Sequence, residues 1–137
     1  MPEYSFTCPK TRSDSSRRFL SSLKDPKPKD IIIQINDTYQ DGEDVSWLWD
    51  VDFQYLADSN AATITTCGTR KHDMGLRLKY EDIDCTSTDD MRSRVEELTE
   101  NGTKNLYIIV NYSGLYRTNR MLKELAQNTK EQKGEQA

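Results

Sequence analysis

The chain has 137 residues, of which 31% are charged, and its formal net charge is −4. This length favours one domain with a core of its own. No basic patch interleaved with aromatic residues is present, which argues against nucleic acid as a partner. The apolar runs are far shorter than the roughly 20 residues that cross a bilayer, and the polar start has no signal-peptide pattern. We therefore expect no membrane span and a cytoplasmic location.

The two ends of the chain are polar and differ in composition from its middle. Residues 1–12 show no pattern and are interpreted as a disordered or cut N-terminal edge. One domain is expected over residues 13–127, followed by a polar tail over 128–137 that we expect to be disordered. A first helix is predicted over residues 11–23, because prolines at 26 and 28 end it and apolar side chains recur at Phe19, Leu20 and Leu23.

Strands and helices then alternate along the chain. The predicted strands are Asp30–Ile35, Ala61–Cys67, Asp82–Thr86 and Leu106–Val110. The predicted helices are Lys71–Tyr80, a helix capped by Ser87 or Thr88 with its apolar stripe at Met91, Val95 and Leu98, and Ser113–Gln127. Residues 50–57 fit a short helix or an extended piece equally well. The order predicts an α/β fold: a three-layer, doubly wound, mostly parallel sheet of about four strands with flanking helices.

The segment 36–53 follows the first of these strands and stands out by composition. It contains five aspartates, one glutamate and both tryptophans of the chain. Indole rings in a polar loop need a surface to cover them, so we expect this loop to hold one shape. Loops at the carboxyl ends of parallel strands carry the sites of open α/β sheets. We therefore place the functional site in this segment.

The sequence lacks the residue patterns of several kinds of binding and catalytic site. No phosphate-binding or dinucleotide-binding glycine pattern is present, and the calcium-loop spacing fails at Tyr39. The thiols of Cys8, Cys67 and Cys85 are too widely spaced for a zinc site, and we interpret the latter two as buried structural thiols. His72 is expected at an exposed helix start, with no second histidine for a metal. What remains is a row of carboxylates without a nucleophile, which can orient a histidine, ligate magnesium or simply be solvated.

Three stretches carry a resemblance to a known family. Residues 41–53, with the order Asp-x-Ser-Trp-x-Trp-Asp-x-Asp-Phe from Asp44, resemble a signature of the C-terminal domain of MurT, the Mur-ligase-like subunit of lipid II isoglutaminyl synthase. Residues 66–80 and 106–115 resemble two further segments of the family in the same order. The resemblance covers about residues 13–125, and it implies the Rossmann-like fold of a Mur ligase C-terminal domain.

The resemblance also implies a reaction and a partner. MurT works with GatD, a glutamine amidotransferase that releases ammonia with a Cys–His pair. MurT uses ATP and magnesium to activate D-glutamate in the stem peptide of lipid II, which ammonia then amidates. By this resemblance Asp44, with Asp50 as runner-up, would complete the Cys–His pair of GatD. Contacts to the partner are assigned to Trp47, Trp49, Asp52 and Phe53.

Two assignments are left open. The alternative to a partner contact for the two tryptophans is packing in the core of this domain. Asn36 and Asp37 match a region that approaches ATP in Mur ligases. Because the stretch contains neither the family's ATP-binding domain nor its cysteine cluster, the chain alone is expected to bind no cofactor and to be inactive.

Two competing interpretations remain at this level. The domain can be a docking module for an amidotransferase, in which the carboxylates only steer or solvate. It can instead be an independent carboxylate enzyme or a metal protein, which micromolar binding of magnesium or calcium would reveal.

Overall fold

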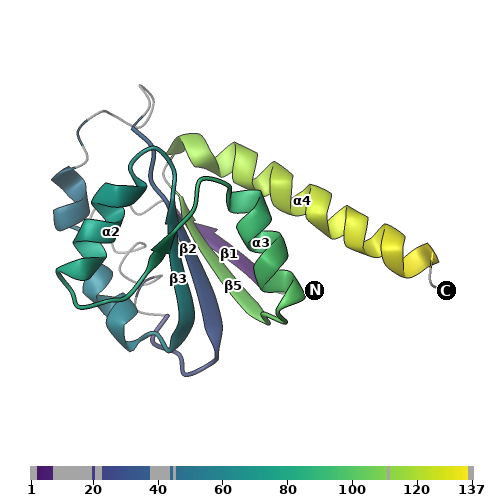
Figure 1. Cartoon of the computed structure of the whole chain (residues 1–137), viewed down its shortest axis with the longest axis horizontal. Helices are drawn as coiled ribbons and strands as arrows, with labels where there is room; N and C mark the ends of the chain where they lie inside the picture. Colours follow the sequence, from purple (N-terminus) through teal and green to yellow (C-terminus); the bar gives the residue numbers. More distant parts are fainter. Residues whose placement is uncertain are drawn as a thin grey trace.

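The fold is organised around a five-stranded sheet, shown in Figure 1. The computed structural model describes residues 3–7, 20, 23–37, 44, 46–110 and 112–135. The strands lie in the order β1-β5-β2-β3-β4, and every pairing among them is parallel. Their bounds are β1 (Glu3–Thr7), β2 (Lys29–Gln34), β3 (Ala61–Cys67), β4 (Thr86–Ser87) and β5 (Asn105–Val110).

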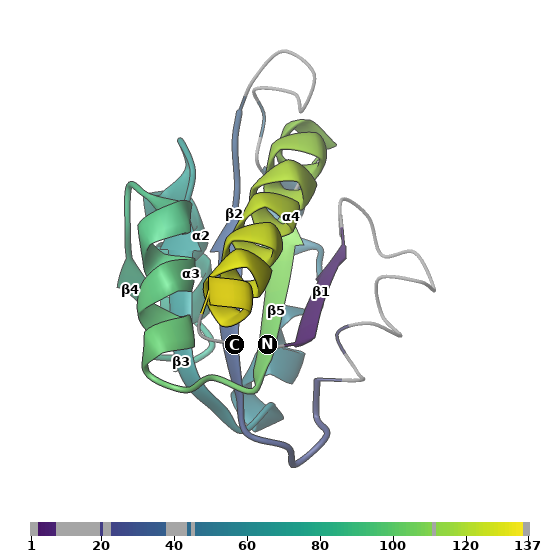
Figure 2. The ribbon, with the colours of Figure 1, turned by 90° about the vertical axis from the view of Figure 1, so that its right-hand side faces the viewer.

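Helices cover both faces of this sheet. One face carries α2 (Lys71–Lys79) and the two short 3-10 helices η1 (Ser46–Trp49) and η2 (Phe53–Asp58). The other face carries α3 (Met91–Glu100) and α4 (Tyr112–Glu135), which lie in front of the strands in Figure 2. The predicted three-layer α/β architecture is therefore confirmed.

The central strand β2 divides the core between the two faces. Ile31 and Ile33 pack with Met74 and Leu78 of α2, whereas Ile32 packs with the side chains of α3 and α4. Successive side chains of a strand point to opposite faces, so an uninterrupted apolar run means burial on both. The sequence interpretation of this strand is therefore confirmed.

Other predicted elements agree with the structure, with shifts at their ends. Strand β3 and helix α2 match their predicted ranges closely. Helix α3 ends at Glu100 and is followed by Asn101 and by Gly102, whose φ is +87°. Residues 53–58 form the 3-10 helix η2, which resolves the open choice for that stretch. Of the predicted helix over 11–23, only Leu20 and Leu23 lie among the described residues, and both are buried.

Four expectations are corrected. Residues 3–7, part of the edge expected to be disordered or cut, form strand β1, which pairs with β5 and brings the sheet to five strands. The backbone of the expected tail continues as α4 to residue 135. The strand predicted over 82–86 is shorter and later, at Thr86–Ser87, and Asp82, with a φ of +56°, is not in an extended conformation. Asp90, not Ser87 or Thr88, caps α3 by accepting from the Ser93 N–H.

A buried lysine, Lys29, connects the start of β2 to two neighbouring segments of the chain. Lys29 is 1% exposed, and its ammonium donates to the carbonyl oxygens of Leu23 at 3.0 Å, Asp25 at 2.6 Å and Ser59. Burial lowers the pKa of Lys29, although the nearby charge of Asp25 opposes this shift. Three carbonyl acceptors offset the cost of burying the charge, so the lysine stabilises the segment before β2 and the end of η2 together.

Candidate functional site

The predicted site segment begins where β2 and β3 end side by side. The Ile35 N–H donates to the Cys67 carbonyl at 3.0 Å, and the Arg70 N–H donates to the Ile35 carbonyl at 2.9 Å. Gly68 lies between these bonds with a φ of +92°, and a Cβ there would lie 2.4 Å from the Ile35 carbonyl oxygen. Only glycine fits this crossing of two backbones. The loop after β2 is therefore held against the turn before α2.

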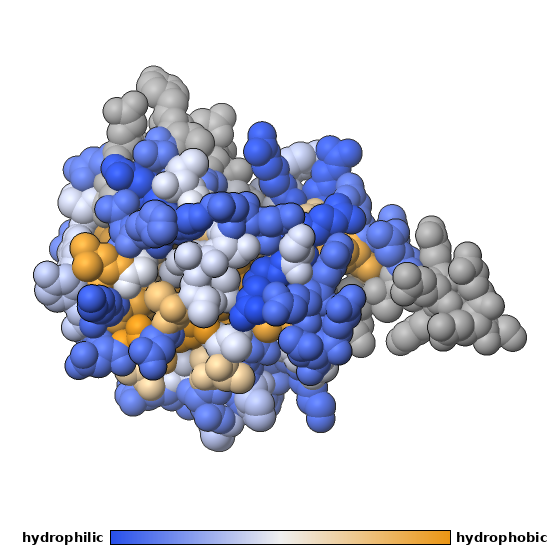
Figure 3. Space-filling view, viewed as in Figure 1, coloured by the Kyte–Doolittle hydropathy of each residue, from blue (hydrophilic) through white to orange (hydrophobic). Residues whose placement is uncertain are grey.

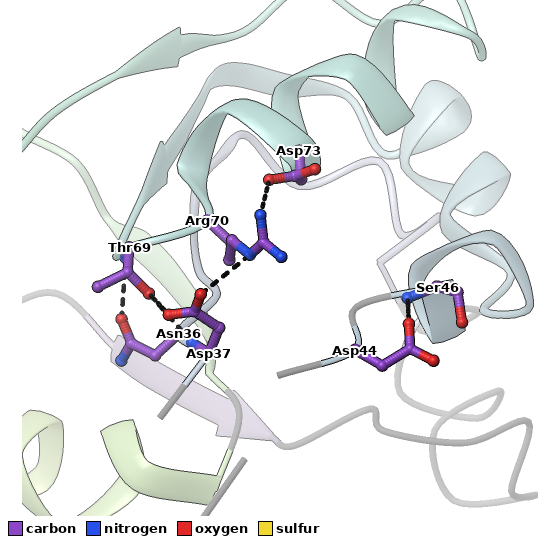
Figure 4. A network of polar contacts seen from close by, with 7 residues as sticks. All are labelled: Asn36, Asp37, Asp44, Ser46, Thr69, Arg70 and Asp73. Carbon is purple, nitrogen blue, oxygen red and sulfur yellow. Dashed lines mark hydrogen bonds and ion pairs between the residues drawn. The ribbon is translucent and has the colours of Figure 1, made fainter. Parts of the chain in front are cut away.

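Asn36 and Asp37 continue this contact with their side chains (Figure 4). The Thr69 N–H donates to Asn36 Oδ1 at 3.1 Å, and the Thr69 hydroxyl donates to Asp37 Oδ1 at 2.7 Å. The Asp37 N–H in turn donates to Thr69 Oγ1 at 3.0 Å. These oxygens serve the domain itself and stiffen the start of the loop. An ATP contact by Asn36 and Asp37 stays a prediction.

Arg70 extends the cluster onto helix α2. Its Nε lies 3.2 Å from Asp37 Oδ2, and its Nη1 lies 3.3 Å from Asp73 Oδ2 in the first turn of the helix. The carboxylate of Asp73 at this position also suits the helix dipole. One half-buried guanidinium thus joins the loop after β2 to α2.

Asp44 lies apart from this cluster, beside the start of η1 (Figure 4). The residue is exposed, and its Oδ1 accepts the backbone N–H of Ser46 at 2.9 Å. Hydrogen bonds from Ser46, first from its backbone N–H, hold the pKa of Asp44 below its ordinary value. The carboxylate is therefore ionised at neutral pH and open to solvent. Its own domain does not seal it off.

The other residues assigned to a partner occupy different environments. Trp49 is 48% exposed, and its ring meets that of Tyr80. Asp50 is exposed, whereas Asp52 is half-buried and accepts from Gln54 Nε2 at 3.1 Å. The backbone of Trp47 is part of η1, but its side chain is not among the described parts of the structure.

Phe53 is fully buried in the core beneath α2. It belongs to the same buried cluster as Met74 and Leu78 of that helix. A buried ring has no surface to offer another protein. The expected contact between Phe53 and a partner is therefore wrong.

Arg77 on α2 holds the segment that carries these residues, and its role was not predicted. The residue is 4% exposed, and its guanidinium donates to the carbonyls of Leu48 at 2.9 Å and Val51 at 3.0 Å. It also forms an ion pair with Glu81 at 2.6 Å. The sequence contains one signal: Arg77 stands three residues after Met74, on the apolar stripe of the helix.

The described thiols and His72 do not form a nucleophilic site. Burial raises the pKa of Cys67 to about 12 and also raises that of Cys85, whose thiol is half-buried. Cys67 is a buried thiol, as predicted, whereas Cys85 is only half-buried. A raised pKa disfavours the thiolate, which is the reactive form of a cysteine. His72 is exposed at the second residue of α2, as predicted. Within the described residues, no cluster of three or more His, Cys, Asp or Glu side chains could hold a metal ion.

Comparisons with known proteins place this chain in a family. A family model described as "MurT ligase C-terminal" matches residues 15–115. The chain is 27% identical over 100 residues to "Lipid II isoglutaminyl synthase (glutamine-hydrolyzing) subunit MurT" of Streptococcus pneumoniae (strain ATCC BAA-255 / R6), an alignment that covers 71% of this chain and 22% of that protein. The proteins of the same name from Staphylococcus aureus strains COL and N315 are each 38% identical over 53 residues, 39% of this chain and 12% of theirs.

The chain is therefore shorter than these relatives and corresponds to one part of them. It spans about a fifth of the length of the Streptococcus pneumoniae protein and less of the Staphylococcus aureus proteins. Among the helices that the structure describes, none combines the length and apolar character that crossing a membrane requires.

Proposed function

Because the chain belongs to the MurT ligase C-terminal family, we propose that it docks a glutamine amidotransferase subunit of the GatD type and lends that subunit a carboxylate. Glutamine hydrolysis on the partner would then supply ammonia to a ligase that amidates D-glutamate in the stem peptide of lipid II. The names of the relatives support this proposal, since they combine a synthase subunit with glutamine hydrolysis. The ATP and magnesium of the ligation step belong to the longer protein in this proposal.

One observation carries the proposal. Asp44 presents an exposed, ionised carboxylate whose direction is set by the hydrogen bond from the Ser46 N–H. A histidine that serves as a base needs one tautomer and one orientation, and a carboxylate that accepts its second N–H supplies both. Such a carboxylate must lie about 2.6–3.2 Å from the imidazole nitrogen. Asp44 is accessible and already held by its neighbour, which supports this role toward an incoming ring.

The partner's Cys–His pair would do the covalent chemistry. Its thiol attacks the side-chain amide of glutamine while the histidine accepts and then returns the proton that leaves with ammonia. Asp44 touches only the histidine in this scheme and stabilises the imidazolium that forms. The thiols described in this chain are unsuited to that role, since burial raises the pKa of Cys67 and of Cys85.

Asp44→Asn tests the proposal in a complex of this chain with its amidotransferase partner. We expect glutamine hydrolysis to fall by orders of magnitude while the complex still forms, because the amide presents the wrong hydrogen-bonding groups to the histidine. The equivalent change in serine proteases costs about 10⁴-fold. Asp50→Asn is the matched variant, since Asp50 is exposed six residues later and is the second candidate. Wild-type hydrolysis by Asp44→Asn would refute the assignment, and loss in Asp50→Asn alone would move it there.

A docking module without a catalytic contribution is the second candidate. The half-exposed ring of Trp49 beside Tyr80 favours it, because large rings left on a surface are typical of binding hot spots. In this case Trp49→Ala weakens association and Asp44→Asn changes neither binding nor hydrolysis. Isothermal titration of the isolated chain with ATP, magnesium or calcium tests the remaining alternative. We expect no binding, and micromolar binding would support an independent site.

A further inference from the structure

We propose that Arg77 is a positioning residue for Asp44: it holds the segment after Asp44 in shape, so that the carboxylate is in place before a partner arrives. The inference rests on the proposed function of Asp44. It concerns a residue that would touch neither the partner's histidine nor the substrate.

The contacts of Arg77 converge on the end of η1. Its Nε donates to the Leu48 carbonyl and its Nη2 donates to the Val51 carbonyl, on either side of Trp49 and Asp50. The last carbonyls of a helix lack partners within the helix. A four-residue 3-10 helix also has little stability of its own. The guanidinium therefore supplies hydrogen bonds that η1 cannot make for itself.

Aromatic rings hold the guanidinium from its other sides. Its carbon lies 5.5 Å from the centre of the Trp49 ring and 5.8 Å from that of Phe53. Glu81, one turn later on α2, accepts from Nη1 at 2.6 Å and compensates the charge. Because these contacts hold the guanidinium in place, Arg77 anchors the segment after Asp44 to helix α2.

The link from Arg77 to Asp44 runs through η1. Ser46 is the first residue of η1, and its N–H is the donor that holds Asp44 Oδ1 at 2.9 Å. Loss of the hydrogen bonds at the end of η1 would therefore free the donor at its start. A displacement of about 1 Å at a catalytic group can cost about 100-fold in rate. The expected effect is thus on catalysis by the complex and not on glutamine binding by the partner.

The first test uses this chain without any partner. We expect the backbone amide of Ser46 to exchange with deuterium at least about tenfold faster in Arg77→Met, because the opening free energy of η1 falls. Amides in the middle of α3, such as that of Val95, should exchange at the wild-type rate. A merely structural role would accelerate exchange in both places. An unchanged Ser46 amide, or equal acceleration at Ser46 and Val95, would overturn the proposal.

The second test uses the complex with the amidotransferase. Arg77→Met should lower kcat for glutamine hydrolysis by roughly 10- to 100-fold at a saturating concentration of the chain, with KM for glutamine unchanged. Arg77→Lys should fall between Arg77→Met and the wild type, since an ammonium can reach one carbonyl but lacks the planar fork. Arg92→Met is the matched control, because Arg92 is an exposed arginine on α3 that pairs with Glu96 and Glu124. It should leave kcat unchanged.

The outcomes separate this proposal from the function on which it rests. If Asp44→Asn lowers kcat but Arg77→Met and Arg77→Lys do not, the positioning role is refuted and the proposed function survives. If Asp44→Asn leaves kcat at the wild-type value, the proposed function fails, and the amide exchange of Ser46 still decides whether Arg77 holds the loop. Should Arg77→Met fail to fold, Arg77→Lys replaces it in both tests, since it weakens the contacts to the Leu48 and Val51 carbonyls and keeps a positive charge at this position.

Discussion

Trp49 and Tyr80 meet edge to face on the surface of the domain, with ring centroids 5.2 Å apart and ring planes at 82°. Trp49 comes from η1 and Tyr80 directly follows α2, so the pair joins the loop to the helix. Tyr80 is 70% exposed. Figure 3, viewed as Figure 1, shows apolar surface in the region of α2. The arrangement leaves two exposed aromatic rings, in contact with each other, next to the segment that begins at Asp44.

Trp49→Ala should therefore weaken binding of the amidotransferase more than it weakens the fold. Removal of a hot-spot ring typically costs 2 kcal/mol or more, or roughly 30-fold in affinity. Tyr80→Ala should act in the same direction, because its ring supports that of Trp49. Titration calorimetry of the complex measures the change, with Tyr116→Ala on α4 as the control for an exposed tyrosine elsewhere. A loss of stability without a loss of affinity would instead assign Trp49 to packing alone.

Gly68→Ala should destabilise the domain more than Gly102→Ala does. Both glycines have positive φ, +92° and +87°, so each substitution carries the strain of a left-handed backbone, about 1–2 kcal/mol. At Gly68 the new Cβ would also lie 2.4 Å from the Ile35 carbonyl oxygen and 2.8 Å from Asn36 Oδ1, whereas nothing lies within 4 Å at Gly102. Overpacking adds about 1–3 kcal/mol. Urea unfolding of both variants gives the comparison, and equal losses would contradict the close crossing of the two loops.

The stability of the domain should fall in acid partly through the cap of α3. Asp90 accepts from the Ser93 hydroxyl at 2.8 Å and from its N–H at 3.2 Å. The hydroxyl first, and then the N–H, hold the pKa of Asp90 below its ordinary value of 3.8. The unfolded chain therefore binds more protons between the two pKa values, so this stabilisation is complete above 3.8 and is lost as pH falls through the folded pKa.

Asp90→Asn isolates that contribution. An asparagine keeps a capping oxygen but does not titrate in this range. The difference in unfolding free energy between wild type and variant, measured by chemical denaturation, should be constant near neutral pH and should shrink below about pH 4. A difference that stays constant down to pH 2.5 would mean that the charge of the Asp90 carboxylate does not contribute to the stability of the folded domain.

The architecture can be predicted from the sequence because the spacing of the apolar residues indicates which segments are buried strands and which are amphipathic helices. The run at Ile31–Ile33 can only be buried on both faces, and the stripe at Met91, Val95 and Leu98 can only be a helix packed on the sheet. Strand β1 was missed because residues 3–7 contain polar positions and owe their strand form to pairing with β5. The cap at Asp90 was misplaced because Ser87, Thr88 and Asp90 are all good capping residues, and β4 uses the first of them.

The sequence by itself determined the location of the candidate site, because the carboxylates and indoles are concentrated in one loop around Asp44. Tertiary structure alone decided which of them face outward: Asp44 and Trp49 remain accessible, whereas Phe53, four residues after Trp49, is buried. It also decided that Arg77, 28 residues beyond Trp49, holds their loop. The physical reason is that a hydrogen bond depends on where two groups lie in space, and the spacing of residues along the chain specifies this only within a single helix or strand.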